Sequence, residues 1–481
     1  MSGSNDSALR DVMDTETVNS DGAAAPAGSL RELLYVAFPL IISAGSLSLM
    51  NAVDRAFLAV LDIDALAASM PASMMLWTSL SLPLGIAGYT NAFVAQYEGA
   101  QRKDRVASSI WQGLLVATLG AAFILPFVIF SKEVFAFMEH ESRVQVLEVE
   151  YFCYVAPSAL PMLAATVLSS FFAARKETLA VMYVNVGTSI LNGVLDYLLI
   201  FGVAGFPALG IRGAAVGTVI AQVVAVVVFS VLLIRTARRE SYPFGETFGF
   251  DPPLLRRMLF YGFPNGIQMV LDVGAFTAFL ALVGRLGTLE QAATNLAFTL
   301  NSLAFVPMLG MGTAVLTLVG RRVGEQRPEL ATRTVWGAMA ISGLYMIGFA
   351  GIYLTIPETI LSPFMHSQER DMFAEIEPIV IQLLRFVAVY TLFDAMAIVF
   401  GSAIRGAGET RFSMIYTVTM SWLLMVLPTL WIVQTSQSLY SCWIAATVFI
   451  IVLGIGFLVR FLQGKWKTMK VIEHQEEYTL P

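Results

Sequence analysis

The sequence is poor in the residues on which soluble proteins and most enzymes depend. Charged residues make up only 13% of its 481 positions, against roughly a quarter in a typical soluble chain. It has three histidines and two cysteines, Cys153 and Cys442, both in an apolar sequence context. We therefore expect neither a disulfide framework nor a zinc site. The motifs HExxH and GxxxxGK[ST] are also lacking, which argues against an intramembrane protease and an ATP-driven pump.

Long apolar runs dominate what remains. Hydrophobic residues make up 57% of the chain and the mean hydropathy is +0.72. A helix needs about 20 apolar residues to cross a bilayer, and its backbone is satisfied internally. The runs predict an all-α integral membrane protein with twelve transmembrane helices, at 33–60, 66–97, 107–131, 147–173, 178–203, 211–236, 254–284, 290–320, 331–357, 376–404, 412–434 and 438–462.

The distribution of lysine and arginine predicts the orientation of these spans. Cytoplasmic loops carry an excess of both residues. If the N-terminus is cytoplasmic, the even-numbered loops and the two tails hold 22 of the 29 basic residues, and the odd-numbered loops hold five. We therefore expect a multi-pass protein of the plasma membrane (the inner membrane of a bacterium) with both termini in the cytoplasm.

The chain aligns with itself at a shift of about 225 residues. The matches fall on Pro, Gly, Gln and Trp rather than on common apolar residues: Phe38-Pro39 with Phe263-Pro264, Gly99 with Gly324, Gln101 with Gln326, and Trp111 with Trp336. Six spans per repeat is an even number, so both halves insert the same way round, as parallel repeats. Transporters of this build bind substrate between their halves and expose it to alternate sides.

This repeat predicts the domain organisation. We expect an N-terminal six-helix lobe at 33–236 and a C-terminal six-helix lobe at 254–462, joined by a cytoplasmic linker at 237–253. Residues 1–32 are rich in Ser, Asp, Ala and Gly and are predicted to form a disordered cytoplasmic tail. A second cytoplasmic tail, 463–481, is polar from about Lys465 and is expected to be loose.

Four aspartates, two in each half, lie inside the predicted spans: Asp54, Asp196, Asp272 and Asp394. An ionised carboxylate at the centre of a span costs about 2.5–3.5 kcal/mol on insertion scales, so such residues are rare and usually functional. Counting along the helices places Asp54 and Asp196 in the outer half of the membrane and the other two near its middle. The pattern predicts an ion-driven transporter.

Several of these residues belong to motifs that resemble the multidrug and toxic compound extrusion (MATE) family, most closely its bacterial NorM-like branch. The resemblance covers roughly residues 30 to 462. Asp272 follows Pro264 by eight residues and stands where NorM-like members typically have a glutamate. The similar stretches are Phe38-Pro39-Leu40 with Val53-Asp54-Arg55-Ala56-Phe57, Asn192-Gly193-Val194-Leu195-Asp196-Tyr197, Gly210-Ile211-Arg212-Gly213-Ala214-Ala215-Val216-Gly217-Thr218, and Phe393-Asp394-Ala395 with Arg405-Gly406-Ala407-Gly408-Glu409-Thr410.

The N-lobe aspartates form the predicted cation-coupling site. Asn192 lies one turn before Asp196 on the same helix face. Together with Asp54, and with the Thr218 hydroxyl as a further candidate, these oxygens could bind Na⁺. The pair could instead bind a proton, because two adjacent carboxylates repel each other. Alternatively, Asp54 pairs with Arg55, and Thr218 bonds its own backbone.

The C-lobe aspartates, Asp272 and Asp394, are predicted to bind a second cation or the cationic substrate. The alternative is a structural carboxylate bonded to a neighbour such as Asn301. Pro39 is a hinge candidate, because proline removes a backbone hydrogen bond and bends helices. A fixed kink at Pro39 is the alternative.

The resemblance implies a secondary antiporter that exports amphipathic organic cations or drugs in exchange for Na⁺ or H⁺, by alternating access between the lobes. A lipid-linked oligosaccharide flippase of the same superfamily is the alternative within transport, although its substrate would require a basic cavity. We expect no enzymatic activity, no cofactor beyond the coupling ion and no nucleic-acid partner. The protein is expected to be a monomer in the lipid bilayer.

Overall fold

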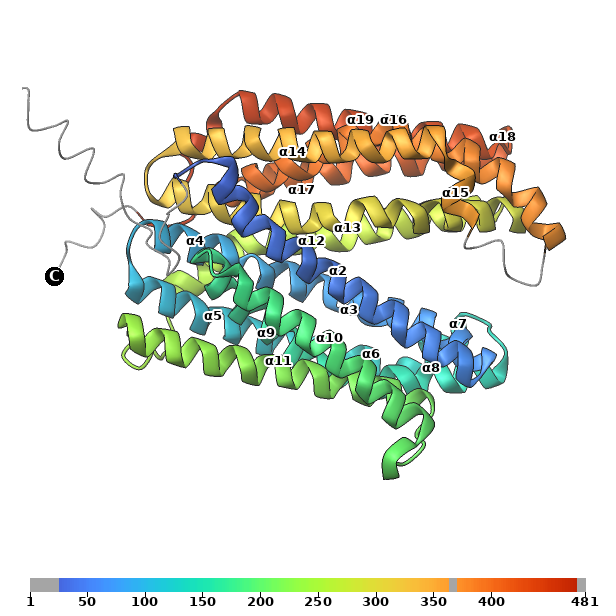
Figure 1. Cartoon of the computed structure of the whole chain (residues 1–481), viewed down its shortest axis with the longest axis horizontal. Helices are drawn as coiled ribbons and strands as arrows, with labels where there is room; N and C mark the ends of the chain where they lie inside the picture. Colours follow the sequence, from blue (N-terminus) through green and yellow to red (C-terminus); the bar gives the residue numbers. More distant parts are fainter. Residues whose placement is uncertain (1–25, 363–369, 474–481) are drawn as a thin grey trace, which may run out of the picture.

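The computed structural model describes residues 26–362 and 370–473, which contain helices and no strand (Figure 1). Twelve helical segments in this part of the chain are long and apolar enough to cross a membrane, which confirms the all-α prediction. They are Leu30–Leu61, Ile63–Gly99, Lys103–Ile129, Ser142–Ala174, Thr178–Phe201, Ile211–Glu240, Pro252–Gly284, Thr288–Gly324, Pro328–Thr355, Glu375–Ala407, Thr410–Thr435 and Leu439–Leu462.

Some spans consist of more than one helix. In the N-terminal half the helices are α2 (Leu30–Leu61), α3 (Ile63–Gly88), α4 (Thr90–Gly99), α5 (Lys103–Ala122), α6 (Leu125–Ile129), α7 (Ser131–Phe137), α8 (Ser142–Val155), α9 (Ala159–Ala174), α10 (Thr178–Phe201) and α11 (Ile211–Glu240). In the C-terminal half they are α12 (Pro252–Gly284), α13 (Thr288–Gly324), α14 (Pro328–Thr355), α15 (Pro357–Leu361), α16 (Arg370–Ala407), α17 (Thr410–Met420), α18 (Leu427–Thr435) and α19 (Leu439–Leu462), with a π-helical segment at Ser421–Val426 between α17 and α18.

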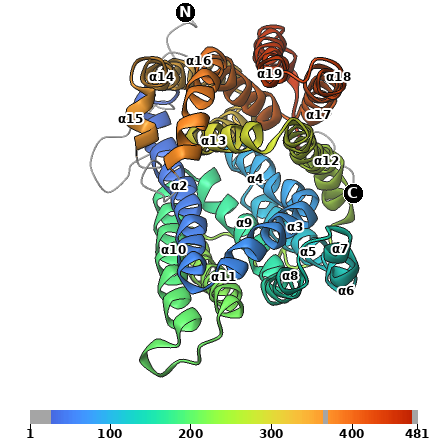
Figure 2. The same ribbon diagram turned by 90° about the vertical axis from the view of Figure 1, so that its right-hand side faces the viewer.

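These helices form two lobes. In the N-lobe, α2 packs on α10, α10 on α11, and α5 on α9; in the C-lobe, α16 packs on α13, α14 and α19. The lobes meet where α2, α3 and α4 of the first contact α12 and α13 of the second. Figure 2 shows this arrangement along the bundle, with α2, α3 and α4 facing α12 and α13.

Both described ends of the chain lie at one end of the bundle, which we call the terminal face. There Gly28 approaches Leu330 of α14, and Glu473 contacts Arg102 and Arg105 at the start of α5. The opposite end, which holds α7 and α15, is called the far face (Figure 1). Of the predicted N-terminal tail, residues 1–25 lie outside the described part of the chain, and α2 begins at Leu30.

The internal repeat is visible in the backbone. Gln101 and Gln326 occupy equivalent turns and share a left-handed conformation, with φ of 58° and 60°. Gly99 and Gly324 are also equivalent, and each packs on the other's lobe. A Cβ added to Gly324 would overlap the carbonyl oxygen of Gln96, and a Cβ added to Gly99 would overlap that of Arg321. The two halves therefore meet at the terminal face through a reciprocal contact of backbone on backbone.

A second pair of equivalent glycines, Gly85 and Gly310, brings the lobes into close contact further from the terminal face. A Cβ on Gly85 would lie 2.5 Å from Cα of Gly266, and a Cβ on Gly310 would lie 2.6 Å from Cα of Ile41. Hydrogen bonds reinforce this half of the interface. Asn265 Nδ2 donates to the carbonyl oxygen of Gly85 at 2.8 Å, and Asn91 Nδ2 donates to Thr317 Oγ1 at 2.8 Å. All of these contacts lie in the half of the helices nearer the terminal face, which is therefore the closed end.

The last described residues differ from the sequence prediction. Instead of forming a loose tail, Lys465–Glu473 packs across the terminal face. Trp466 is completely buried and its ring stacks on Phe461 at a centroid distance of 5.1 Å. Val471 and Ile472 are also buried. The three buried apolar side chains lie among several charged and polar residues and have no helical period, so the sequence pattern did not reveal this packing.

Candidate functional site

The structure brings Asp54, Asn192 and Asp196 together inside the N-lobe. Asp54 projects from α2, and Asn192 and Asp196 lie one turn apart on α10. The exposed fraction is 7% for Asp54 and 0% for the other two residues. The two carboxyl groups lie within hydrogen-bonding range of each other. The sequence prediction thus grouped three residues that meet in space from two helices 138 positions apart (54 to 192).

Asn192 links this pair to a third helix. In the orientation that satisfies both ends of its amide, the nitrogen donates to Asp54 Oδ1 at 2.9 Å and the oxygen accepts from the backbone N–H of Thr218 at 3.2 Å. The Thr218 hydroxyl itself donates to the carbonyl oxygen of Ala214 at 3.1 Å. Thr218 therefore contacts the site through its backbone, while its hydroxyl takes the bond to the preceding turn that is common for threonine in membrane helices.

A glycine makes room for Asp196. A Cβ added to Gly217 of α11 would overlap Oδ1 of Asp196. Only glycine allows α11 to approach α10 this closely, so the carboxylate is confined between the two helices. The other oxygen, Oδ2 of Asp196, is buried without a hydrogen-bond partner. A buried polar atom without a partner is costly, and here it marks a position where a proton or a cation would be stabilised.

The immediate surroundings of the pair test the alternative in which Asp54 only pairs with Arg55. Arg55 is exposed on α2, and no ion pair joins it to Asp54 in the described structure. Tyr151 of α8 was not singled out from the sequence, yet its buried phenol interacts with Ser73 and electrostatically with both aspartates. A tyrosine in an apolar helix gives no sequence signal, because most such residues fill the core.

The aspartate pair is connected to a cavity. Asp54 and Tyr151 line a space of about 170 Å³ inside the N-lobe, together with apolar side chains such as Trp77 and Met162. A second space of about 290 Å³ reaches the C-lobe at Gly310. The two spaces share the lining residues Leu47, Thr166, Ser169 and Asn185. The cavity that Asp54 lines and the cavity at the lobe interface are therefore adjacent and separated by side chains that belong to both.

The C-lobe aspartates are arranged differently. Asp272 of α12 is half-buried and accepts a hydrogen bond from Gln268 Nε2, one turn earlier, at a long 3.4 Å. Gln268 is buried and its Oε1 accepts from Ser413 Oγ at 3.0 Å. Arg405 of α16 contributes a positive charge to the surroundings of Asp272. Gln268 was also missed from the sequence, and it acts as the connection between Asp272 and α17.

Asp394 lies on α16 and is half-buried. Within the described residues its carboxylate has no hydrogen-bond donor, and no bond joins it to Asp272 or to Asn301. The C-lobe aspartates are therefore two separate carboxylates. Pro39, the hinge candidate, is buried inside α2 and lies beside Leu40 and Ile41, which contact Gly310 of the other lobe.

These donor sets define what the sites could hold. In the described residues, no group of three or more His, Cys, Asp or Glu side chains gathers into a metal site. The N-lobe site offers two carboxyl groups and one amide. Two carboxyl groups within hydrogen-bonding range can share one proton, which removes their mutual repulsion.

Comparisons with known proteins agree with this architecture. The MatE family model matches residues 39–198 and 264–431, once in each lobe. A probable multidrug resistance protein NorM of Bradyrhizobium diazoefficiens is 23% identical over 433 residues, which cover 89% of this chain and 92% of the relative. The multidrug resistance protein NorM of Burkholderia vietnamiensis is 27% identical over 408 residues, which cover 83% of this chain and 87% of the relative.

The fold is likewise that of a solved structure described as the outward-facing conformation of a multidrug resistance MATE family transporter. The TM-score is 0.83 at 20% sequence identity, and the match covers 93% of this chain and 100% of the other. The family match spans more than half of the chain and both lobes. The chain therefore belongs to the MATE family, as a NorM-like transporter and not an enzyme.

Proposed function

We propose that this transporter is a secondary antiporter that exports amphipathic organic cations in exchange for a cation that enters through Asp54 and Asp196. The observation that carries the proposal is the buried pair of carboxyl groups, of which Asp54 lines a cavity while Asp196, behind it, has its Oδ2 buried without a partner. The NorM relatives, named as multidrug resistance proteins, support a drug-like substrate. The cavity walls suit such a substrate, since aromatic and methionine side chains adapt to varied apolar cations.

The coupling ion favoured by the geometry is the proton. The carboxyl groups of Asp54 and Asp196 are close enough to share one, and the donor that Asn192 directs at Asp54 is an N–H group. An N–H group stabilises a carboxylate but repels Na⁺. Na⁺ is the second candidate, because the unpartnered Asp196 Oδ2 and a rotated Asn192 amide would supply oxygen ligands. Hard cations of this kind prefer several such oxygens.

Helix α2 connects the ion site to the lobe interface. Asp54 lies 13 residues after Ile41, which is about 20 Å along the helix, and Ile41 packs directly against Gly310 of the C-lobe. Protonation of the pair removes a negative charge from the wall of the cavity and so weakens the binding of an organic cation. Linkage then requires that a bound drug weakens proton binding by the same factor. One inward charge contributes about 2.3 kcal/mol per 100 mV to this exchange.

The terminal face is assigned to the cytoplasm, in the plasma membrane or bacterial inner membrane. The excess of lysine and arginine in the loops of this face supports the assignment. Drug would then enter the cavity when the terminal face is open and leave from the far face. We propose that a single chain performs the cycle, because each lobe contributes its own half of the interface.

Transport in proteoliposomes tests the coupling ion. Purified protein is reconstituted and ethidium movement is followed under an imposed pH gradient or an imposed Na⁺ gradient at the same membrane potential. We expect the pH gradient alone to drive ethidium against its concentration gradient. Transport driven by Na⁺ alone would assign the site to Na⁺, and movement that ignores both gradients would refute ion-coupled antiport.

A further inference from the structure

The C-terminal segment Lys465–Glu473, here called the strap, crosses from one lobe to the other. It leaves α19 at Gly464, whose φ of 72° turns the chain back over the bundle. Trp466 anchors its start: the ring is buried and Nε1 donates to the carbonyl oxygen of Phe461 at 3.0 Å. This first part of the strap is therefore fixed to the C-lobe.

The middle of the strap lies between the lobes. The backbone N–H of Val471 donates to Oε1 of Gln96 on α4, at 2.9 Å. The amide nitrogen of the same glutamine donates to the carbonyl oxygen of Gly406 on α16, at 3.0 Å. Gly408, just beyond α16, is close to the strap, since a Cβ there would lie 2.9 Å from Cγ1 of Val471. Gln96 thus connects an N-lobe helix, a C-lobe helix and the strap.

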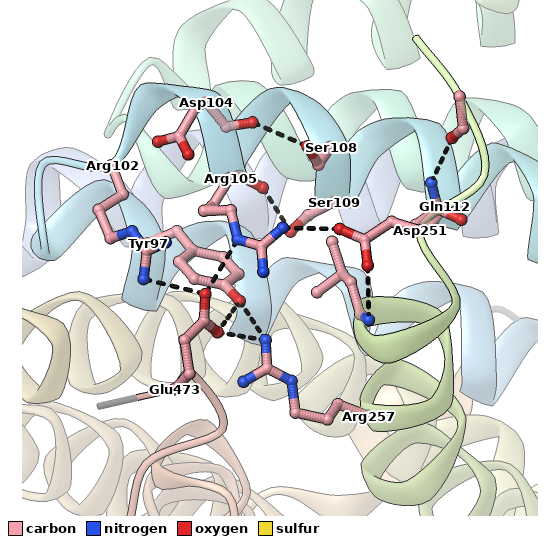
Figure 3. Close-up of polar contacts among 12 residues, drawn as sticks. Tyr97, Arg102, Asp104, Arg105, Ser108, Ser109, Gln112, Asp251, Arg257 and Glu473 are labelled. Carbon is pink, nitrogen blue, oxygen red and sulfur yellow. Dashed lines mark hydrogen bonds and ion pairs between the residues drawn. The ribbon is translucent and has the colours of Figure 1, made fainter. Parts of the chain in front are cut away.

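The strap ends at Glu473, whose carboxylate is surrounded by cations from both lobes (Figure 3). From the N-lobe, Arg102 and Arg105 each contact it at 2.9 Å. From the C-lobe, Arg257 of α12 pairs with the other carboxylate oxygen of Glu473. The same oxygen accepts a hydrogen bond from the hydroxyl group of Tyr97, on α4 of the N-lobe, at 2.6 Å. The Glu473 side chain is only 4% exposed. We call Tyr97 and the three arginines the basic cradle.

The cradle favours the ionised carboxylate strongly. Burial raises the pKa of Glu473, but hydrogen bonds from Tyr97, its own backbone, Arg257 and Arg105 outweigh this and lower the pKa to about 2. A buried carboxylate with several charge-assisted bonds is held more firmly than an exposed one. Removing one partner of such a group leaves the remaining charges buried and unpaired.

The cradle lies beside the contact that closes the terminal face. Tyr97 lies two residues before Gly99, and Arg102 follows Gly99 by three residues. Gly99 and its repeat partner Gly324 form the contact in which the lobes meet backbone to backbone. If the lobes separate at this end, α4 and α12 part, and Glu473 cannot keep Arg105 and Arg257 together. Opening the face therefore requires the ion pairs of the strap to break.

We infer that the strap is an intramolecular latch, which holds the terminal face closed through Glu473 and must release the basic cradle whenever this face opens. The latch rests on the proposed function only in requiring that the terminal face opens during transport. Removing the charge of Glu473 takes away the carboxylate that all three arginines share, while Asp251 still pairs with Arg105 at 2.6 Å. The mutual repulsion of the arginines then favours separation of the lobes.

The test uses full-length protein in lipid nanodiscs, where both faces are accessible and no gradient or substrate is needed. Cys153 and Cys442 are replaced by alanine, and Ala95→Cys serves as the reporter. Ala95 is completely buried and lies opposite Gly320 of the other lobe. A membrane-impermeant maleimide labels this cysteine only when the terminal face opens. Glu473→Gln is compared with the parent and with Glu246→Gln, which removes an exposed carboxylate from the linker on the same face.

We expect Glu473→Gln to raise the labelling rate of Ala95→Cys on the order of tenfold or more, because a buried charge cluster loses its counter-ion. Val471→Asp, which removes the apolar contact of the strap and leaves the cradle intact, should raise it as well. Glu246→Gln should match the parent. Equal rates in Glu473→Gln and the parent would overturn the latch.

A second sample reports unfolding. The same variants carrying native Cys442 as their only cysteine should stay unlabelled, since Cys442 is completely buried in the C-lobe core. If a variant raises the labelling rate of Cys442 as well as that of Ala95→Cys, the whole protein has loosened, and the latch is refuted. Because no gradient is imposed and no drug is added, these outcomes are independent of the proteoliposome test of antiport.

Discussion

The contact between Gly324 and Gln96 makes closure of the terminal face directly testable. A Cβ at residue 324 would overlap the Gln96 carbonyl oxygen and lie 2.8 Å from its carbon. These are backbone atoms of the last turn of α4, and the carbonyl oxygen already accepts a hydrogen bond from the N–H of Ala100 at 2.9 Å, so they cannot rotate aside. Overpacking of a tight interface costs about 1–3 kcal/mol and occasionally more. Since about 1.4 kcal/mol corresponds to a tenfold change in an equilibrium constant, Gly324→Ala should shift the protein from closed to open by roughly five- to hundredfold.

The assay is the labelling of Ala95→Cys in nanodiscs. We expect Gly324→Ala to react faster than the parent by this factor, because the open form relieves the overlap. Gly88→Ala is the matched control: an added Cβ there would make only an ordinary contact, 3.8 Å from Cγ2 of Thr166. If Gly324→Ala is labelled as slowly as Gly88→Ala, the glycine contact does not control the closed state, and the reasoning is wrong.

Three further predictions follow from the same structure. Gly217→Ala should abolish ion-coupled transport while the protein stays folded, because the new methyl group displaces Asp196. Gly187→Ala on α10 is the control: an added Cβ there meets open space, so this variant should transport normally in the same proteoliposomes. Asp272→Asn should weaken drug binding, measured by fluorescence quenching. It should not change the pH dependence of coupling, because Asp272 lies in the C-lobe, apart from the Asp54–Asp196 pair. A changed pH dependence would contradict this separation of the two sites. The contribution of Glu473 to closure should be constant from pH 8 to pH 5, since its pKa is lowered to about 2 by the cradle despite the opposing effect of burial. It should be lost only as the pH falls from the ordinary glutamate range toward 2. The ratio of the Ala95→Cys labelling rate in Glu473→Gln to that in the parent, measured at the same pH, should therefore stay constant between pH 8 and pH 5, and a fall in this ratio over that range would contradict the prediction.

The spans and the repeat could be predicted from the sequence because both depend on strong local signals. Apolar length identifies a membrane helix regardless of its neighbours. The residues that aligned at a shift of about 225 do so for a structural reason: Gly99 and Gly324 occupy the same close contact, and Gln101 and Gln326 the same left-handed turn. Such residues are hard to replace, so they preserve the repeat.

The N-lobe cluster was also predictable in part. Depth along the helices places Asp54 and Asp196 at similar levels, and helical spacing places Asn192 beside Asp196. Depth says nothing about the direction in which a side chain points around its helix. For this reason the sequence could not show that Asp54 and Asp196 meet whereas Asp272 and Asp394 remain separate.

The remaining features depend on tertiary contacts. Tyr151 and Gln268 become part of the sites only when helices distant in sequence pack together. The strap is nine residues long, too short for a periodic pattern, and its partners Gln96 and Arg105 lie more than 360 residues away. A polar C-terminal sequence is typical of a loose tail, and only the folded lobes provide the surface that orders it.

The central claim is that the Asp54–Asp196 pair couples ion entry to drug export, and one measurement tests it most directly. Ethidium transport under an imposed pH gradient is compared in proteoliposomes for the wild-type protein, Asp54→Asn and Asp64→Asn. Asp64 is a partly exposed aspartate of the far face that pairs with Arg143 at 2.9 Å, and it serves as the control. We expect wild type and Asp64→Asn to accumulate ethidium and Asp54→Asn to lose coupled transport. Coupled transport by Asp54→Asn at the wild-type rate would contradict the account.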